Sequence, residues 1–222
     1  MTALVIGATG LVGSELVDQL LSDNSFGKII VFVRRSMGKE HSKLTEHIID
    51  FDSPRQWNML VQGDVLFSTL GTTLKQAGSK GAQFKIDYTY QYQFAKAASE
   101  NGVKQYVLVS AANSSPNSKI FYSRMKGILE KDIKSLPFEY ISILRPGMLT
   151  GNRKDKRMGE IIGTPILQFL QHLPGLKSLK PISATVVSKA MIKATSYHPE
   201  RINEYTLSEV FKLAYKSTTE IK

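Results

Sequence analysis

A tyrosine, a lysine and a serine are spaced so that together they could transfer a proton to or from a substrate. Tyr122 and Lys126 are four residues apart, which places them on one face of a helix, and Ser110 ends the strand-like run before that helix. A lysine cation stabilises the phenolate form of a nearby tyrosine, so the phenol can donate or accept a proton. The serine hydroxyl could hold a substrate carbonyl. We therefore predict that these three residues are catalytic.

The same tyrosine and lysine spacing occurs a second time, at Tyr92 and Lys96. This pair lies in the middle of a predicted helix, where its face packs against a sheet or meets solvent. Only Tyr122 and Lys126 begin a helix directly after the carboxyl end of a predicted strand. We therefore interpret Tyr92 and Lys96 as structural residues.

Three glycines follow the first predicted strand and open a helix, in the run Gly7-Ala8-Thr9-Gly10-Leu11-Val12-Gly13. In a strand, helix, strand unit the first glycine permits a tight turn, the second lets the backbone approach a pyrophosphate, and the third lets helix and strand pack closely. The alternative is a glycine turn with a structural role only. We predict a dinucleotide site that includes Gly7, Thr9, Gly10, Leu11, Val12 and Gly13.

Two arginines follow the second predicted strand, at the position that distinguishes NAD from NADP. An acidic side chain there would accept hydrogen bonds from a ribose 2′-hydroxyl, whereas Arg34 and Arg35 can pair with a 2′-phosphate. These residues favour NADP(H) over NAD(H). The alternative is that both arginines belong to a solvated basic loop.

The ends of three further predicted strands supply more candidates for cofactor binding. An acidic side chain there could meet an adenine amino group, and a glycine allows the backbone to approach the cofactor closely. Each feature is also typical of an ordinary turn or helix cap. The predicted residues are Asp50, Phe51, Leu70, Gly71, Thr72, Pro146 and Gly147.

Hydrophobic periodicity predicts the elements that position these residues. Amphipathic helices over about 11–21, Gln83–Glu100 and Lys119–Ser135 alternate with short β-branched runs. Strands separated by helices imply an α/β fold with a doubly wound, Rossmann-type parallel sheet whose ligand lies at the carboxyl ends of the strands. The predicted strands are Ala3–Ile6, Lys28–Val33, His47–Asp50, Val65–Leu70, Gln105–Ser110 and Tyr140–Leu144.

The sequence changes in character after Gly147. A basic loop at 153–157 is followed by apolar-periodic segments near 160–172 and 184–196 and by a strand-like run, Glu204–Leu207. This stretch is too short for an independent domain. We predict a single domain over 1–222, in which about 148–222 form a small lobe on the substrate side of the sheet.

The composition narrows the classes of protein. The chain of 222 residues has no cysteine, which excludes disulfides, thiolate zinc sites and a cysteine nucleophile, and its four histidines show no metal-binding spacing. It has no apolar run of the about 18 residues needed to span a membrane, and its N-terminus lacks the layout of a signal peptide. We expect a cytoplasmic protein without a metal site.

The net charge of +10 favours an anionic partner, such as nucleic acid, a membrane surface or a phosphate-bearing ligand. The basic loop at 153–157 could bind nucleic acid or an anionic membrane surface. No nucleic-acid-binding motif accompanies it, and lysines are spread through the whole chain. We expect no specific nucleic-acid partner.

Taken as an ordered set, these motifs resemble the short-chain dehydrogenase/reductase superfamily, in particular its atypical members with an N-terminal GxxGxxG. Within that group the chain looks like the Tat-interacting-protein oxidoreductase family over residues 3 to 150. The motifs that carry the narrower likeness are Leu70-Gly71-Thr72-Thr73, Lys75 to Gly78, Asp87-Tyr88, Tyr122 to Gly127 and Arg145-Pro146-Gly147.

The resemblance implies NADP(H) binding, with Tyr122 as the acid or base, Ser110 orienting the carbonyl, and Lys126 binding the nicotinamide ribose and tuning Tyr122. The sequence departs from the pattern at Asp87, where many relatives carry asparagine, which puts a shared proton relay in doubt. Its C-terminal part is also much shorter than in nucleotide-sugar epimerases, so a nucleotide-sugar substrate is not expected.

Two functions follow from these features. The first is an NADP(H)-dependent oxidoreductase that transfers a hydride between nicotinamide and a small carbonyl or alcohol substrate. The second is an NADPH-binding regulatory or scaffold protein, in which the cofactor shapes a surface for a protein partner. The sequence leaves the substrate, the direction of reaction and the oligomeric state open.

Overall fold

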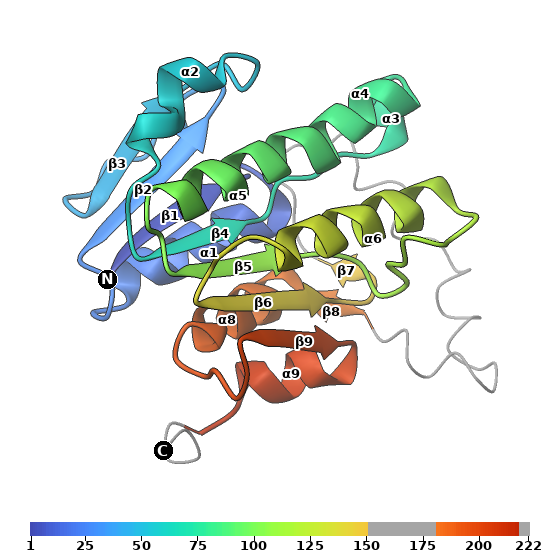
Figure 1. Cartoon of the computed structure of the whole chain (residues 1–222). Helices are drawn as coiled ribbons and strands as arrows, with labels where there is room; N and C mark the ends of the chain where they lie inside the picture. Colours follow the sequence, from blue (N-terminus) through green and yellow to red (C-terminus); the bar gives the residue numbers. More distant parts are fainter. Residues whose placement is uncertain (151–180, 218–222) are drawn as a thin grey trace.

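The computed structural model describes residues 1–150 and 181–217. Its centre is a seven-stranded parallel sheet in the order β3-β2-β1-β4-β5-β6-β9, with helices on both faces (Figure 1). The strand order reverses direction between β1 and β4. The predicted Rossmann-type doubly wound sheet is confirmed, and its ligand crevice is expected where the order reverses.

The elements have the following bounds. The strands of the large sheet are β1 (Thr2–Ile6), β2 (Lys28–Val33), β3 (Leu44–Ile48), β4 (Val65–Ser68), β5 (Gln105–Val109), β6 (Tyr140–Arg145) and β9 (Ile202–Thr206). A two-stranded sheet joins β7 (Leu149–Thr150) to β8 (Ile182–Ser183). The longer helices are α1 (Leu11–Ser22), α5 (Gln91–Glu100), α6 (Phe121–Lys134), α8 (Ala184–Ala194) and α9 (Ser208–Ala214). Shorter helical segments are α2 (Pro54–Trp57), η1 (Asn58–Leu60), α3 (Leu74–Ala77), α4 (Lys80–Phe84) and the π-helical η2 (Lys85–Tyr90).

The alternation of side chains along each strand divides the core into two layers. Ala3 and Val5 of β1 pack in the layer formed with α1, α8 and α9, whereas Leu4 and Ile6 pack in the layer formed with α5 and α6. Because both faces of the sheet are covered, β1 is apolar and buried from Ala3 to Ile6.

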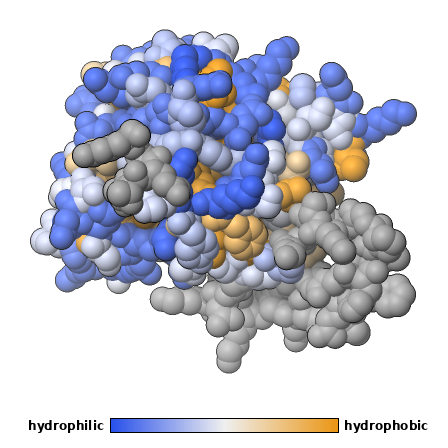
Figure 2. Space-filling model, turned by 90° about the horizontal axis from the view of Figure 1, so that it is seen from below, coloured by the Kyte–Doolittle hydropathy of each residue, from blue (hydrophilic) through white to orange (hydrophobic). Residues whose placement is uncertain are grey.

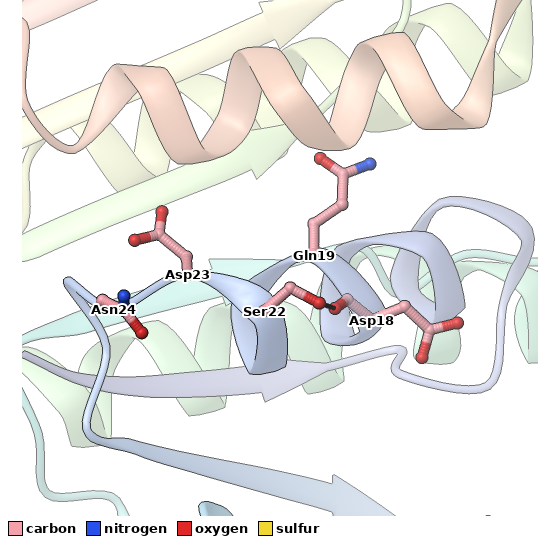
Figure 3. Close-up of a pocket in the computed structure, with 5 residues that line it drawn as sticks. All are labelled: Asp18, Gln19, Ser22, Asp23 and Asn24. Atoms are coloured by element: carbon pink, nitrogen blue, oxygen red, sulfur yellow. Dashed lines mark hydrogen bonds between the residues drawn. The ribbon is translucent and has the colours of Figure 1, made fainter.

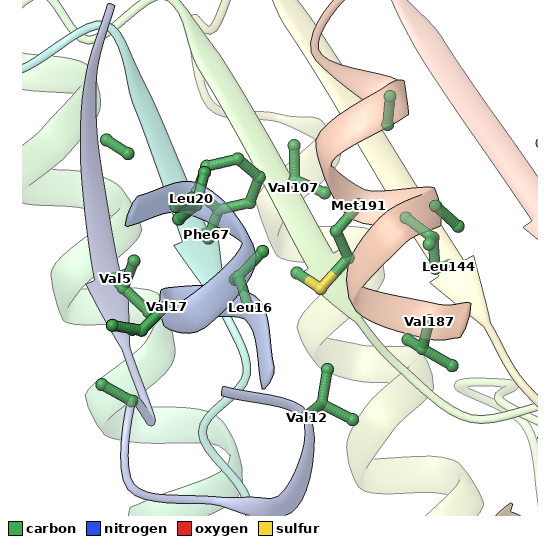
Figure 4. Packing of buried hydrophobic residues seen from close by; sticks show 14 of the residues in the cluster. Val5, Val12, Leu16, Val17, Leu20, Phe67, Val107, Leu144, Val187 and Met191 are labelled. Carbon is green, nitrogen blue, oxygen red and sulfur yellow. The ribbon is translucent and has the colours of Figure 1, made fainter. Parts of the chain in front are cut away.

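Figure 4 shows the first of these layers, in which α1 and α8 lie side by side on the sheet. Leu16 and Leu20 of α1 and Val187 and Met191 of α8 are fully buried there. Each such side chain contributes about 1.5–3 kcal/mol when it leaves water. The α8 residues 184–194, which are far from α1 in sequence, therefore complete the core on the face of the sheet that α1 covers.

One predicted strand is displaced. We predicted His47–Asp50, but β3 is Leu44–Ile48, because β2 pairs with it in a register that begins at Ile29 opposite Leu44. The strand lies at the edge of the sheet and its side chains are only partly buried, so its apolar pattern is weak. The other predicted strands agree with the structure to within about two residues, as is usual for element ends.

The described part of the C-terminal segment belongs to the main sheet. β9 pairs in parallel with β6, and α9 packs beside it. The basic loop at 153–157 and the predicted apolar segment at 160–172 lie outside the described residues.

Figure 2 shows a face on which hydrophilic residues dominate and hydrophobic ones form smaller areas near its middle. Across residues 1–150 and 181–217, no helix is both long and apolar enough to cross a membrane.

The close approach of α1 to the turn that follows β1 provides a test of the fold. Gly13→Ala should lower the free energy of unfolding by about 3 kcal/mol or more, because a Cβ there would lie 2.1 Å from the carbonyl oxygen of Gly7. Gly27→Ala is the matched control, since its Cβ would meet no described atom within 4 Å. Urea denaturation of both variants measures the difference, and equal midpoints would contradict this packing constraint.

Candidate functional site

The predicted site residues meet at one edge of the sheet because its parallel strands end level with one another. Ile6 of β1 pairs with Phe32 of β2 and Ser68 of β4, and Val109 of β5 pairs with Leu144 of β6. The segments that leave these strands therefore lie side by side. They begin at Gly7, Arg34, Thr69, Ser110 and Pro146.

The turn between β1 and α1 requires its first and third glycines. Gly7 has φ +81°, and a Cβ there would lie 2.5 Å from the backbone nitrogen of Leu70. Gly10 donates its backbone N–H to the carbonyl of Gly7 at 2.9 Å and begins α1 without a side-chain cap. The amides of the first helical turn have no acceptor within the helix, so they are available to an anion.

The side chains around this turn differ in what they can offer a ligand. Thr9 is exposed and Leu11 is half-buried, whereas Val12 lies in the core and can offer a ligand only its backbone. Arg34 and Arg35 are both exposed just past the end of β2.

The two candidates after β3 have structural partners. The carboxylate of Asp50 accepts hydrogen bonds from the backbone N–H of Asp52 at 3.0 Å and the hydroxyl of Ser53 at 2.9 Å, so it forms the turn into α2. Phe51 is buried, with its ring 5.4 Å from that of Phe94. The side chain of Phe51 therefore belongs to the core.

The loop after β4 is attached to a buried carboxylate. Thr72 donates its backbone N–H to Oδ2 of Asp87 at 2.8 Å, and its carbonyl accepts from Gln83 at 3.2 Å. A Cβ on Gly71 would lie 3.2 Å from Oδ1 of Asp87. The loop that begins at Leu70 thus lies directly against Asp87.

Asp87 in turn pairs with Lys126. The lysine Nζ lies 3.0 Å from Oδ1 of Asp87, and the two side chains are only 3% and 1% exposed. Burial by itself would lower the pKa of Lys126, but the nearby Tyr122, Asp87 and Glu130 together raise it above its ordinary value. Lys126 is therefore a buried cation at neutral pH.

Tyr122 lies one turn before Lys126 on α6, with the centre of its ring 5.9 Å from the lysine Nζ. Its side chain is 39% exposed, so a ligand can reach it. The structure therefore brings Tyr122 and Lys126 together and connects them, through Asp87, to the loop after β4.

Ser110 is buried at the end of β5 and is bonded to residues that the sequence analysis did not select. Its hydroxyl donates to Oε1 of Glu130, and its Oγ lies 3.0 Å from that of Ser114. Glu130 also accepts from Nε of Arg145, at 3.1 Å to each carboxylate oxygen. Glu130 stands four residues after Lys126, so the helical spacing that selected Tyr122 and Lys126 could have revealed it.

The remaining predicted residues lie as follows. Pro146 is buried and Gly147 is half-buried beyond the end of β6. Tyr92 stacks on Tyr88 with ring centres 6.0 Å apart, and the exposed Lys96 pairs with Glu100 at 3.8 Å.

Comparison with known proteins decides the family. The sequence model of the HIM1 family matches residues 36–174. The chain belongs to the HIM1 family. The narrower predicted likeness, to the Tat-interacting-protein family, is not supported by this finding.

Curated relatives of this HIM1-family chain are called "Protein FMP52, mitochondrial". The protein from Eremothecium gossypii is 38% identical over 174 residues, which are 78% of this chain and 76% of that protein. The protein from Candida albicans is 38% identical over 200 residues, or 86% of each chain, and the one from Saccharomyces cerevisiae is 37% identical over 161 residues, or 71% and 69%. The expectation of a cytoplasmic protein is contradicted by these mitochondrial relatives and was wrong.

Solved structures show which proteins share the fold. The HIM1-family chain is similar to a UDP-glucose 4-epimerase from Thermotoga maritima in complex with UDP-glucose, with a TM-score of 0.67, 17% identity, and coverage of 96% of this chain and 81% of the epimerase. It is also similar to the enzyme WbmH from Bordetella bronchiseptica in complex with NAD+, with a TM-score of 0.68, 16% identity, and coverage of 92% and 74%. At these identities the likeness shows a fold of the short-chain dehydrogenase/reductase type.

Away from this edge, a surface depression lies at the C-terminal end of α1. Asp18, Gln19, Ser22, Asp23 and Asn24 line it, and Gln19 and Asp23 point toward the neighbouring helix in Figure 3. Gln19 bonds to Ser188 of α8 at 2.8 Å, so it connects the two helices. In the described ranges, no cluster of three or more histidine, aspartate or glutamate side chains could hold a metal ion.

The buried ion pair predicts a pH-dependent effect on stability. Asp87→Asn should lower the free energy of unfolding at pH 7 by about 3 kcal/mol or more, because it leaves the buried ammonium of Lys126 without a counter-charge. The raised pKa of Lys126 means that the pair stabilises the wild type below the lysine's ordinary value of 10.5 and loses this effect as pH rises further. The difference between variant and wild type should therefore be fully present at pH 7 and should narrow only above the lysine's ordinary pKa, for example at about pH 11.5.

Urea denaturation at both pH values measures this difference. Glu100→Gln, which breaks the exposed pair with Lys96, is the control and should change stability little at either pH. A constant difference across the pH range would show that Asp87 acts by something other than charge.

Proposed function

We propose that this chain is an NADP(H)-dependent oxidoreductase that transfers a hydride between nicotinamide and a small carbonyl or alcohol substrate. The observation that carries the proposal is the contact of Thr72 with Asp87 and of Asp87 with Lys126. This contact joins the Tyr122 and Lys126 face of α6 to the sheet edge that holds the glycine turn. A nucleotide-binding turn and a proton-transferring pair at one edge are what such a reaction requires.

The glycine turn fits a dinucleotide. A Cβ at Gly10 would meet only the carbonyl oxygens of Gly7, at 3.2 Å, and Thr69, at 4.0 Å, so the outer side of the turn is open among the described residues. The first-turn amides of α1 would bind the pyrophosphate, together with the backbone of Thr9. On this proposal Leu70, Gly71, Thr72, Pro146 and Gly147 line the nicotinamide end.

Arg34 and Arg35 would select NADP(H). Both guanidinium groups are exposed just past the end of β2, the strand that pairs with β1, where a 2′-phosphate could pair with them in a bidentate manner. Solved structures of the same fold, such as WbmH, are described in complex with NAD+, so the phosphate preference rests on these two side chains.

Tyr122 and Lys126 of α6 have separate roles in this proposal. The bound cofactor supplies or accepts the hydride at the substrate carbon. Tyr122 donates a proton to the substrate oxygen during reduction and accepts it in the reverse direction. The ammonium of Lys126 has three N–H donors, of which Asp87 takes one, so the others can hold the ribose hydroxyls and face Tyr122.

The cofactor preference can be measured by calorimetric titration with NADPH and NADH separately. Wild-type protein should bind NADPH at least about tenfold more tightly than NADH, because a paired phosphate is worth about 1.5–3 kcal/mol. Arg34→Ala combined with Arg35→Ala should remove that preference and leave NADH binding nearly unchanged. Lys28→Ala, at the opposite end of β2, is the control for loss of positive charge. Absence of binding by either nucleotide would refute the proposed cofactor site.

The proton donor can be tested by Tyr122→Phe, which removes only the phenolic hydroxyl. The variant should lose kcat for NADPH-dependent carbonyl reduction by about a hundredfold or more while its NADPH affinity stays within about twofold of wild type. Tyr92→Phe, on α5, should retain full activity. Turnover at the wild-type rate in Tyr122→Phe would exclude Tyr122 from the reaction.

A further inference from the structure

Glu130 is a buried carboxylate to which the proposed reaction assigns no role. It is 3% exposed and lies one turn beyond Lys126, on the same face of α6. Its two partners lie at the ends of neighbouring strands: Ser110 directly follows β5, and Arg145 is the last residue of β6. Glu130 therefore joins α6 to both strands at the edge where the substrate would bind.

The partners of Glu130 establish its charge. Nε of Arg145 donates to both carboxylate oxygens at 3.1 Å, and hydrogen bonding to Glu130 raises the pKa of Arg145 above its ordinary value. A carboxylate that receives a guanidinium in this way is ionised, and an ionised carboxylate can only accept hydrogen bonds. In the bond between Ser110 and Glu130, the serine must therefore be the donor.

Ser110 has no second proton to give. The neighbouring Ser114 hydroxyl donates to the carbonyl of Ala111 at 2.7 Å, and its Oγ lies 3.0 Å from that of Ser110. A serine hydroxyl carries one hydrogen and two lone pairs, so what remains on Ser110 is acceptor capacity. In this arrangement Ser110 cannot donate to a carbonyl oxygen.

We propose that Glu130 is a positioning residue that holds the proton of Ser110 away from the substrate, so that of the Ser110 and Tyr122 hydroxyls only that of Tyr122 donates to the substrate oxygen. The inference rests on the proposed oxidoreductase function and revises the part that the family resemblance implies for Ser110. Ser110 then supports the end of β5, and the proton for the carbonyl comes from the exposed Tyr122.

The Glu130→Asp variant separates the two functions of the carboxylate, which are to pair with Arg145 and to accept the hydrogen bond from Ser110. The aspartate keeps a negative charge opposite Arg145, which also pairs with Glu204 at 2.9 Å. Its side chain is one methylene shorter, so it cannot reach Arg145 and Ser110 at the same time. In that variant the hydroxyl of Ser110 is free to turn toward the substrate. A role of Ser110 as donor would then appear only when Glu130 is shortened.

The experiment measures kcat and KM for NADPH oxidation with p-nitrobenzaldehyde and with diacetyl as probes. Wild type is compared with Ser110→Ala, with Glu130→Asp and with the double variant, and Ser114→Ala is the control for loss of a neighbouring hydroxyl. Ser110→Ala alone should keep kcat within about threefold of wild type, because the hydroxyl donates nothing to the substrate. In the Glu130→Asp background the same change should cost about tenfold or more, the effect of losing a donor to the carbonyl oxygen.

The outcomes separate the two claims. A loss of kcat greater than tenfold in Ser110→Ala alone would show that Ser110 leaves Glu130 and donates to the substrate, which overturns this inference and keeps the proposed function. Equal effects of Ser110→Ala in both backgrounds would also overturn it. If wild type binds NADPH but reduces neither probe, the proposed function fails and this inference fails with it. Should Glu130→Asp not fold, Ser110→Ala alone can still overturn the inference, through a loss of kcat greater than tenfold.

Discussion

The buried ammonium of Lys126 is the charge around which the candidate site is built. A lysine that is 3% exposed is stable only with a counter-charge, and Asp87 supplies it at 3.0 Å. Since Asp87 also accepts the backbone N–H of Thr72, one carboxylate orders both the helix that carries the lysine and the loop that follows β4.

A second set of charges holds the neighbouring strand ends in place. Arg145 pairs with Glu130 of α6 and with Glu204 of β9, and Glu204 also pairs with Lys134 near the end of α6. Gly127 lets α6 lie against the loop that follows β5, because a Cβ there would lie 2.2 Å from the backbone of Ser115. The ends of β5, β6 and β9 are therefore connected to α6 by side chains as well as by backbone pairing.

The family and the fold give different kinds of information about this chain. Membership of the HIM1 family and the likeness to FMP52 proteins rest on sequence, whereas the epimerases share with it only the arrangement of strands and helices. Function depends on the side chains at the edge of the sheet, and a shared fold does not specify them. The proposed oxidoreductase function therefore depends on the glycine turn, Tyr122 and the buried Lys126.

Local patterns in the sequence determined the fold class, the glycine turn and the residue ranges of most strands, because apolar periodicity and glycine geometry act over a few neighbouring residues. The position of β3 was decided by its pairing with β2, and the place of β9 by its pairing with β6. Tertiary structure likewise decided the role of Asp87, Glu130 and Arg145. Their partners lie 15 to 59 residues away in the chain, so only tertiary contact between α6 and the strand ends makes them part of the site.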